Sequence, residues 1–143
     1  MNQQLRTDIT SMLTPDGPLV QDILAAIPNV LAIYAFGSRI GGEALDESDL
    51  DLAVLVAGYA DPVRLWMLSG DLAGKAHCDV DLLDMRAAST IMQHQILMTG
   101  RRLWARELDA DLFECFVLSE KTALDEARAG LLADIHERGK IYD

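Results

Sequence analysis

Two short apolar segments joined by a glycine-containing loop constrain the fold of this 143-residue chain more than any other feature. Residues 30–36 (VLAIYAF) and 49–57 (DLDLAVLVA) are rich in strand-forming residues and short for a buried helix. A third segment, residues 79–85 (DVDLLDM), has the same character. Strands this apolar are buried in a sheet, and such a sheet needs helices against it. The sequence therefore predicts an α/β domain.

Helical spacing predicts helices before, between and after these strands. Asp61 and Pro62 provide an N-cap and a first-turn proline for one of them. Trp66 falls on an apolar face and is expected in the core. The last helix is expected to end at Gly139 and to close the domain. We predict one domain over residues 1–143, an α+β arrangement in which helices pack against a small mixed sheet. The predicted helices cover residues 3–13, 18–27, 62–76, 87–98 and 107–138, and a short extended piece covers residues 101–104.

Charge and hydropathy exclude several classes of protein. The formal net charge of −11 repels nucleic acid phosphates, so direct binding of DNA or RNA is not expected. No apolar run approaches the roughly 20 residues that span a bilayer, and the first residues lack a secretory signal pattern. Cys78 and Cys115 have no metal-ligand spacing and are expected to be reduced thiols. We expect a cytoplasmic protein that makes no membrane contact.

Two carboxylates lie at the start of the strand predicted over residues 49–57. Asp49 and Asp51 lie two residues apart, which places both side chains on one face of a strand. Their mutual repulsion is removed by a hard divalent cation, and Mg²⁺ commonly binds through one or two carboxylates plus substrate phosphates. The alternative is a solvent-exposed strand end, but aspartate is poorly suited to strands. We therefore predict that Asp49 and Asp51 are metal ligands.

A third carboxylate is expected from residues 79–85. Asp79 and Asp81 fall on one face of this strand, and Asp84 falls on the other. If the strand lies beside residues 49–57, one of the first two can join the metal site. Asp81 is preferred because it lies deeper in the strand, and Asp79 stays open as the alternative.

The Gly37-Ser38 pair follows the first strand directly. Glycine lets the backbone approach a ligand closely, and a hydroxyl beside free N–H groups forms a site for a phosphate. Arg39 is a further candidate for a phosphate contact, with a structural salt bridge as its alternative. On its own, a Gly-Ser pair is more often a simple turn. The Gly37-Ser38 pair indicates a phosphate site only in combination with Asp49-Leu50-Asp51 at this spacing.

The stretch GSRIGGEALDESDLD resembles the signature of the DNA polymerase β-like nucleotidyltransferase superfamily. The short chain, FGSRIGG and DVDLLDMRAAST look like its minimal nucleotidyltransferase (MNT) branch, and in particular like the antitoxins that accompany HEPN-domain toxins. The resemblance covers residues 30–105 and, more weakly, the closing helix. It implies that Gly37 and Ser38 contact the triphosphate. It also implies that Asp49 and Asp51 bind metal.

The same resemblance implies a function. Asp81 matches the family's third carboxylate, and two Mg²⁺ ions with ATP as substrate are expected. The enzyme would transfer AMP to a hydroxyl, with tyrosine as the expected acceptor, of a partner HEPN ribonuclease toxin and silence it. One alternative is an enzyme that modifies a small molecule such as an antibiotic. Another is an antitoxin that acts by binding alone.

Overall fold

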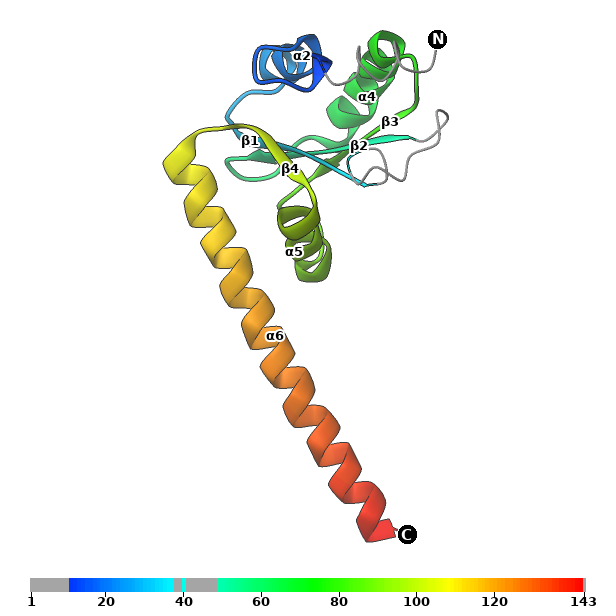
Figure 1. Cartoon of the computed structure of the whole chain (residues 1–143), viewed down its shortest axis with the longest axis vertical. Helices are drawn as coiled ribbons and strands as arrows, with labels where there is room; N and C mark the ends of the chain where they lie inside the picture. Colours follow the sequence, from blue (N-terminus) through cyan, green and yellow to red (C-terminus); the bar gives the residue numbers. More distant parts are fainter. Residues whose placement is uncertain (1–10, 38–39, 41–48, 143) are drawn as a thin grey trace.

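The computed structural model describes residues 11–37, 40 and 49–142 of the 143 (Figure 1). Its four strands form one sheet in the order β3-β2-β1-β4, in which β1 is antiparallel to both neighbours and β2 is parallel to β3. The predicted mixed sheet with helices against it is confirmed. The strands are β1 (Val30–Phe36), β2 (Leu50–Val56), β3 (Val80–Asp84) and β4 (Arg101–Ala105), and the helices are α2 (Pro18–Ala26), α4 (Pro62–Ala76), α5 (Thr90–Thr99) and α6 (Glu107–Tyr142).

Local signals explain where the elements begin. Asp61 caps α4, because its side chain accepts a hydrogen bond from the Val63 N–H at 3.1 Å. The helix predicted from residue 87 starts three residues later, because Ser89 caps α5 by accepting from the Met92 N–H. The predicted helix over residues 3–13 lies mostly outside the described residues. The proposal of one domain over residues 1–143 stays a prediction.

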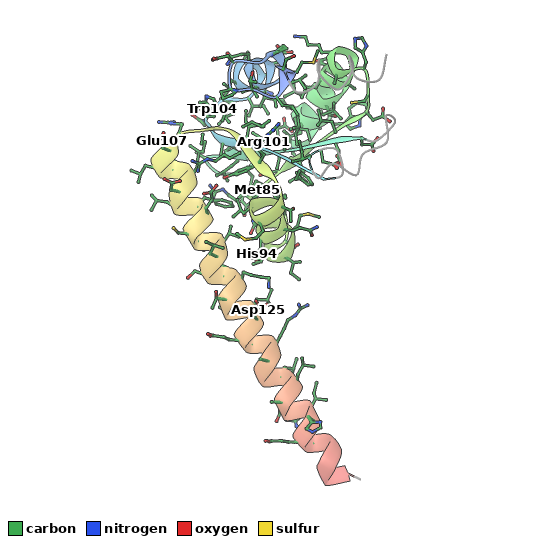
Figure 2. All side chains as sticks on the ribbon, in the orientation of Figure 1. Met85, His94, Arg101, Trp104, Glu107 and Asp125 are labelled. Carbon is green, nitrogen blue, oxygen red and sulfur yellow. The ribbon has the colours of Figure 1, made fainter. Side chains whose placement is uncertain are left out.

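The sheet separates two apolar cores. Alternate residues of β2 point to opposite faces, as the two-residue period of a strand requires. Leu52 and Val54 pack with α2 and α4, whereas Ala53 and Leu55 belong to the core beneath α5 and α6. Met85, labelled in Figure 2 just after β3, is fully buried in this second core. Both faces of the sheet are therefore covered over most of its area.

Only the first part of α6 covers the sheet. Ala110, Phe113 and Val117 are buried, whereas the later residues run away from the domain as a projecting helix (Figure 1). The prediction that α6 ends at Gly139 is wrong, because the helix continues to Tyr142. A single glycine weakens a helix by about 1 kcal/mol relative to alanine, which is too little to end it. In the described part of the chain, no helix is long and apolar enough to cross a membrane.

A buried tyrosine ties α6 to the sheet. Tyr34 of β1 is 1% exposed, and its hydroxyl donates a hydrogen bond to Glu114 Oε1 at 2.9 Å. Arg102 of β4 reaches both Asp111 and Glu114 of the same helix, at 2.9 and 3.4 Å. Burial, followed by the Glu114 charge, raises the pKa of Tyr34 far above its usual value. The neutral phenol is therefore a permanent donor at physiological pH.

We expect Tyr34→Phe to lower the free energy of unfolding by about 1.5–3 kcal/mol, the range for a hydrogen bond to a charged group. Phenylalanine keeps the packing and removes only the donor to Glu114. Urea unfolding measures the change. Tyr59→Phe is the matched control, since Tyr59 is 73% exposed, and it should stay within about 0.5 kcal/mol of the parent. An equal effect of both variants would contradict a role for the Tyr34–Glu114 bond.

Candidate active site

Strand pairing brings two of the predicted carboxylates together. Asp51 of β2 and Asp81 of β3 are register partners in the parallel pair. Both therefore project from the same face of the sheet, the face of Ala53 and Leu55. Asp49 directly precedes β2 and is exposed. The carboxylates thus lie at the start of β2 and in the adjoining edge strand.

Asp51 is at the electrostatic centre of this group. Its pKa is raised first by burial, then by the negative charge of Asp81 and then by that of Asp49. These causes favour the proton over the bare carboxylate, and a divalent cation would remove the same penalty. The donor set fits a hard cation such as Mg²⁺, which prefers carboxylate oxygens.

The described side chains do not by themselves form a complete metal site. Among the described residues, no group of three His, Cys, Asp or Glu side chains stands close enough to hold an ion. This arrangement is compatible with Mg²⁺, which usually binds one or two protein carboxylates together with substrate phosphates and water. The assignment of Asp49, Asp51 and Asp81 as metal ligands stays a prediction.

Gly37 makes room for the Asp51 carboxylate. It follows β1 with a φ of +83°, in the left-handed region that favours glycine. A Cβ at this position would collide with Asp51 Oδ2. The turn and the carboxylate are therefore packed directly against each other. Ser38 and Arg39, the other two predicted phosphate contacts, lie outside the described residues.

We expect Gly37→Ala to weaken binding of metal–ATP roughly tenfold or more, because changing a residue that keeps a metal ligand in position typically costs 10–100-fold in metal affinity. Isothermal calorimetry measures the affinity. Gly58→Ala is the matched control: its φ is +87°, but nothing lies within 4 Å of the added Cβ. Both variants bear the same backbone strain, and only Gly37→Ala displaces Asp51. Equal affinities in the two variants would exclude the Gly37–Asp51 contact from ligand binding.

The two remaining aspartates of the third segment lie elsewhere. Asp79 precedes β3 and is exposed, so it lies outside the strand as the structure has it. Asp84 projects from the α4 face, where its carboxylate accepts from the N–H groups of Ala60 and Arg86 at 2.9 and 3.0 Å. The expected separation of Asp84 from Asp81 across the sheet is thus present, and Asp84 anchors a loop.

Two aromatic side chains near Asp81 were not expected from the sequence. Trp66, expected in the core, is 78% exposed, and Tyr59 is 73% exposed. The expectation for Trp66 is wrong because α4 buries Leu65, Leu68 and Leu72 instead. Both aromatic residues line a hollow of about 580 Å³ that also contains Asp81. A spacing of three to four residues among the apolar positions of α4 could not tell which side faces the sheet.

Several known proteins are similar to this chain. The family model described as Polymerase beta, Nucleotidyltransferase matches residues 19–109. A protein adenylyltransferase, MntA of Shewanella oneidensis, is 37% identical over 109 residues, which are 76% of this chain and 78% of that protein.

Two solved structures are also similar to this chain. The crystal structure of a toxin-antitoxin with AMP-PNP gives a TM-score of 0.73 at 34% identity, covering 82% of this chain and 94% of that chain. A structure of a tri-AMPylated Shewanella oneidensis HEPN toxin in complex with MNT antitoxin gives a TM-score of 0.68 at 30% identity, covering 94% and 98%. With the Asp51–Asp81 pair set against Gly37, these similarities establish that the chain belongs to the polymerase β nucleotidyltransferase family.

Proposed function

We propose that this protein is an antitoxin enzyme that transfers AMP from ATP to a hydroxyl of a partner HEPN toxin and thereby neutralises it. The pairing of Asp51 with Asp81 carries the proposal, because it places two carboxylates of neighbouring strands side by side, one of them against Gly37. The similarity to a protein adenylyltransferase of Shewanella oneidensis supports the reaction type. A tyrosine is the expected acceptor, as the resemblance implies.

The residues divide the chemistry between them. Asp49, Asp51 and Asp81 would hold Mg²⁺, with two ions expected, and the bound cations would neutralise charge on the triphosphate and its leaving group. Gly37, with Ser38 and Arg39, would hold the phosphates. Asp81 would accept the proton of the attacking hydroxyl, directly or through water.

The transfer replaces one bond to the α-phosphorus by another. The acceptor oxygen forms a bond to the α-phosphorus while the bond from that phosphorus to the pyrophosphate oxygen breaks. Pyrophosphate leaves, and the acceptor's proton passes to Asp81 or to solvent. Positioning and charge neutralisation carry this reaction, so no histidine or cysteine nucleophile is required.

A protein acceptor fits this chain better than a small molecule. The complex of a Shewanella oneidensis HEPN toxin with an MNT antitoxin covers 94% of this chain, so the similarity extends over nearly the whole sequence. The net charge of −11 also favours a basic protein partner. A cytoplasmic location stays a prediction.

Incubation of the purified protein with α-labelled ATP, Mg²⁺ and the product of the neighbouring gene, which is expected to be a HEPN protein, tests the proposal. We expect label on the HEPN protein, a mass increase of one AMP or a multiple, and loss of its ribonuclease activity. Chelator should abolish all three changes. Neutralisation of the ribonuclease without any mass change would instead establish an antitoxin that acts by binding. Label on small molecules alone would indicate a small-molecule enzyme.

A further inference from the structure

A continuous groove follows the outer edge of β3. One hollow, of about 580 Å³, is lined by residues 81–84 on the strand side and by Tyr59 and Trp66 on the other. A second hollow, of about 340 Å³, is lined by Asp79 and Val80. Trp66 and Ser69 belong to both linings, so the two hollows adjoin. We call the combined hollow, between residues 79–84 and the outer side of α4, the β3 groove.

The strand wall of this groove has backbone groups that no other strand of the described part of the chain pairs with. β3 is an edge strand, and in the described part of the chain only β2 pairs with it. The Leu50 N–H donates to Asp79 O at 2.8 Å and the Met85 N–H donates to Val54 O at 2.9 Å. Because backbone groups alternate in direction along a strand, those of Val80 and Leu82 point away from β2. The Asp84 carbonyl is already used, since it accepts from the Ala87 N–H at 3.2 Å. A sheet edge of this kind pairs with an extended peptide.

The opposite wall is aromatic and held in place. Trp66 is 78% exposed and Tyr59 is 73% exposed, a large apolar area to leave in water. The loop that carries Tyr59 is attached to the end of β3, since the Ala60 N–H donates to Asp84 Oδ2 at 2.9 Å. Large, partly rigid aromatic side chains of this kind commonly anchor bound proteins.

One residue connects the groove with the chemistry. Asp81 lines the larger hollow and is also the register partner of Asp51. A segment lying along β3 would therefore pass directly beside the proposed proton acceptor. A five-residue strand spans about 17 Å, so a short segment suffices to cover residues 80–84. A small-molecule acceptor would use neither the strand edge nor its whole length.

We propose that the β3 groove binds the acceptor itself: an extended segment of the partner protein that pairs with the outer edge of β3, packs an apolar side chain against Trp66 and presents its hydroxyl beside Asp81. This inference rests on the proposed function and specifies how that function selects its substrate. Asp79 and Asp81 make the groove acidic, so the segment is expected to be neutral or basic. The affinity for ATP is expected not to depend on Trp66 or on the outward N–H of Val80.

Two pairs of variants test the two walls. Trp66→Ala removes the aromatic anchor, and Leu132→Ala, which deletes another exposed apolar side chain on the projecting part of α6, is its control. Val80→Pro removes one outward N–H at the first residue of β3, where proline is tolerated, and Val80→Ala controls for the lost side chain. Thermal melting first confirms that each variant folds.

The measurements are the affinity for the acceptor protein, the KM for that protein during AMP transfer, and the affinity for Mg²⁺–ATP. We expect Trp66→Ala and Val80→Pro to raise the acceptor Kd and KM at least tenfold over their controls, with ATP affinity unchanged.

Acceptor values within twofold of the controls would overturn the groove assignment while leaving the transfer reaction intact. A parent protein that transfers no AMP, but whose acceptor affinity still falls in Trp66→Ala, would refute the proposed function and retain the groove. A parent dimer that Trp66→Ala dissolves would mean that a second copy covers the groove, which also overturns the proposal.

Discussion

Asp51→Asn is expected to reduce AMP transfer roughly a hundredfold or more, the usual cost of removing one group that stabilises charge in a transition state. The amide keeps the shape of the side chain but loses the charge that binds a cation. Asp51 is partly buried and lies between Asp49 and Asp81, so no other carboxylate can take its place without moving the strand. Labelled AMP on the acceptor measures the rate.

The same substitution should make the metal-free protein more stable. Two like charges 4 Å apart repel by about 1 kcal/mol in water and by more where solvent is partly excluded. Asp49 is exposed, whereas burial and both neighbouring charges act on Asp51. We therefore expect the larger gain at Asp51. Thermal melting in chelator measures it.

The pH dependence gives a further check on Asp51. Its pKa in the folded protein is raised, so the folded state binds this proton more tightly than the unfolded state does. The parent therefore loses stability as the pH rises through the raised pKa of Asp51. The advantage of Asp51→Asn should be full at neutral pH and should vanish below the ordinary carboxyl pKa.

Asp79→Asn is the matched control for these measurements, because it removes a nearby exposed carboxylate outside β3. It should change neither stability nor the kcat of transfer by much. An Asp51→Asn variant that melts below the parent in chelator would mean that the carboxylate is structural. Activity within tenfold of the parent would contradict its role as a ligand.

The bounds of strands and helices were predicted closely where residues typical of an element's start or end mark them. Residues 30–36 and 62–76 match β1 and α4, since the first ends at a glycine and the second starts at Asp61-Pro62. Which side of a helix is buried depends on long-range packing, and the sequence did not predict it. The face of α6 that packs on the sheet contains Phe113 and Val117, while the equally apolar Leu112 and Phe116 are exposed. A helix with apolar residues on several sides does not encode which side is covered.

The sequence predicted which aspartates share a face of one strand, but it did not predict which aspartates of neighbouring strands lie side by side. A two-residue spacing placed Asp49 with Asp51 and Asp79 with Asp81, because strand geometry is local. The parallel register that sets Asp51 against Asp81 depends on the crossover through α4, which no local pattern specifies. The contact between Gly37 and Asp51 likewise joins residues that are adjacent only after folding.

Asp81→Asn is expected to be as damaging to transfer as Asp51→Asn, with a loss of roughly a hundredfold or more. Asp81 is the register partner of Asp51 and also lines the β3 groove, so we expect it beside the acceptor hydroxyl and the nucleotide. Asparagine cannot accept the proton. The loss should appear in kcat, whereas the affinity for Mg²⁺–ATP should fall less than in Asp51→Asn.

Two neighbouring aspartates show whether this effect belongs to Asp81 alone. Asp79→Asn should retain near-parental kcat, because Asp79 lies before β3. Asp84→Asn removes charge from the opposite face and weakens the bonds to Ala60 and Arg86, so it should lower stability and raise the acceptor KM while sparing kcat. If Asp79→Asn is inactive and Asp81→Asn works, Asp79 is the third carboxylate. The acceptor hydroxyl would then approach from the start of β3.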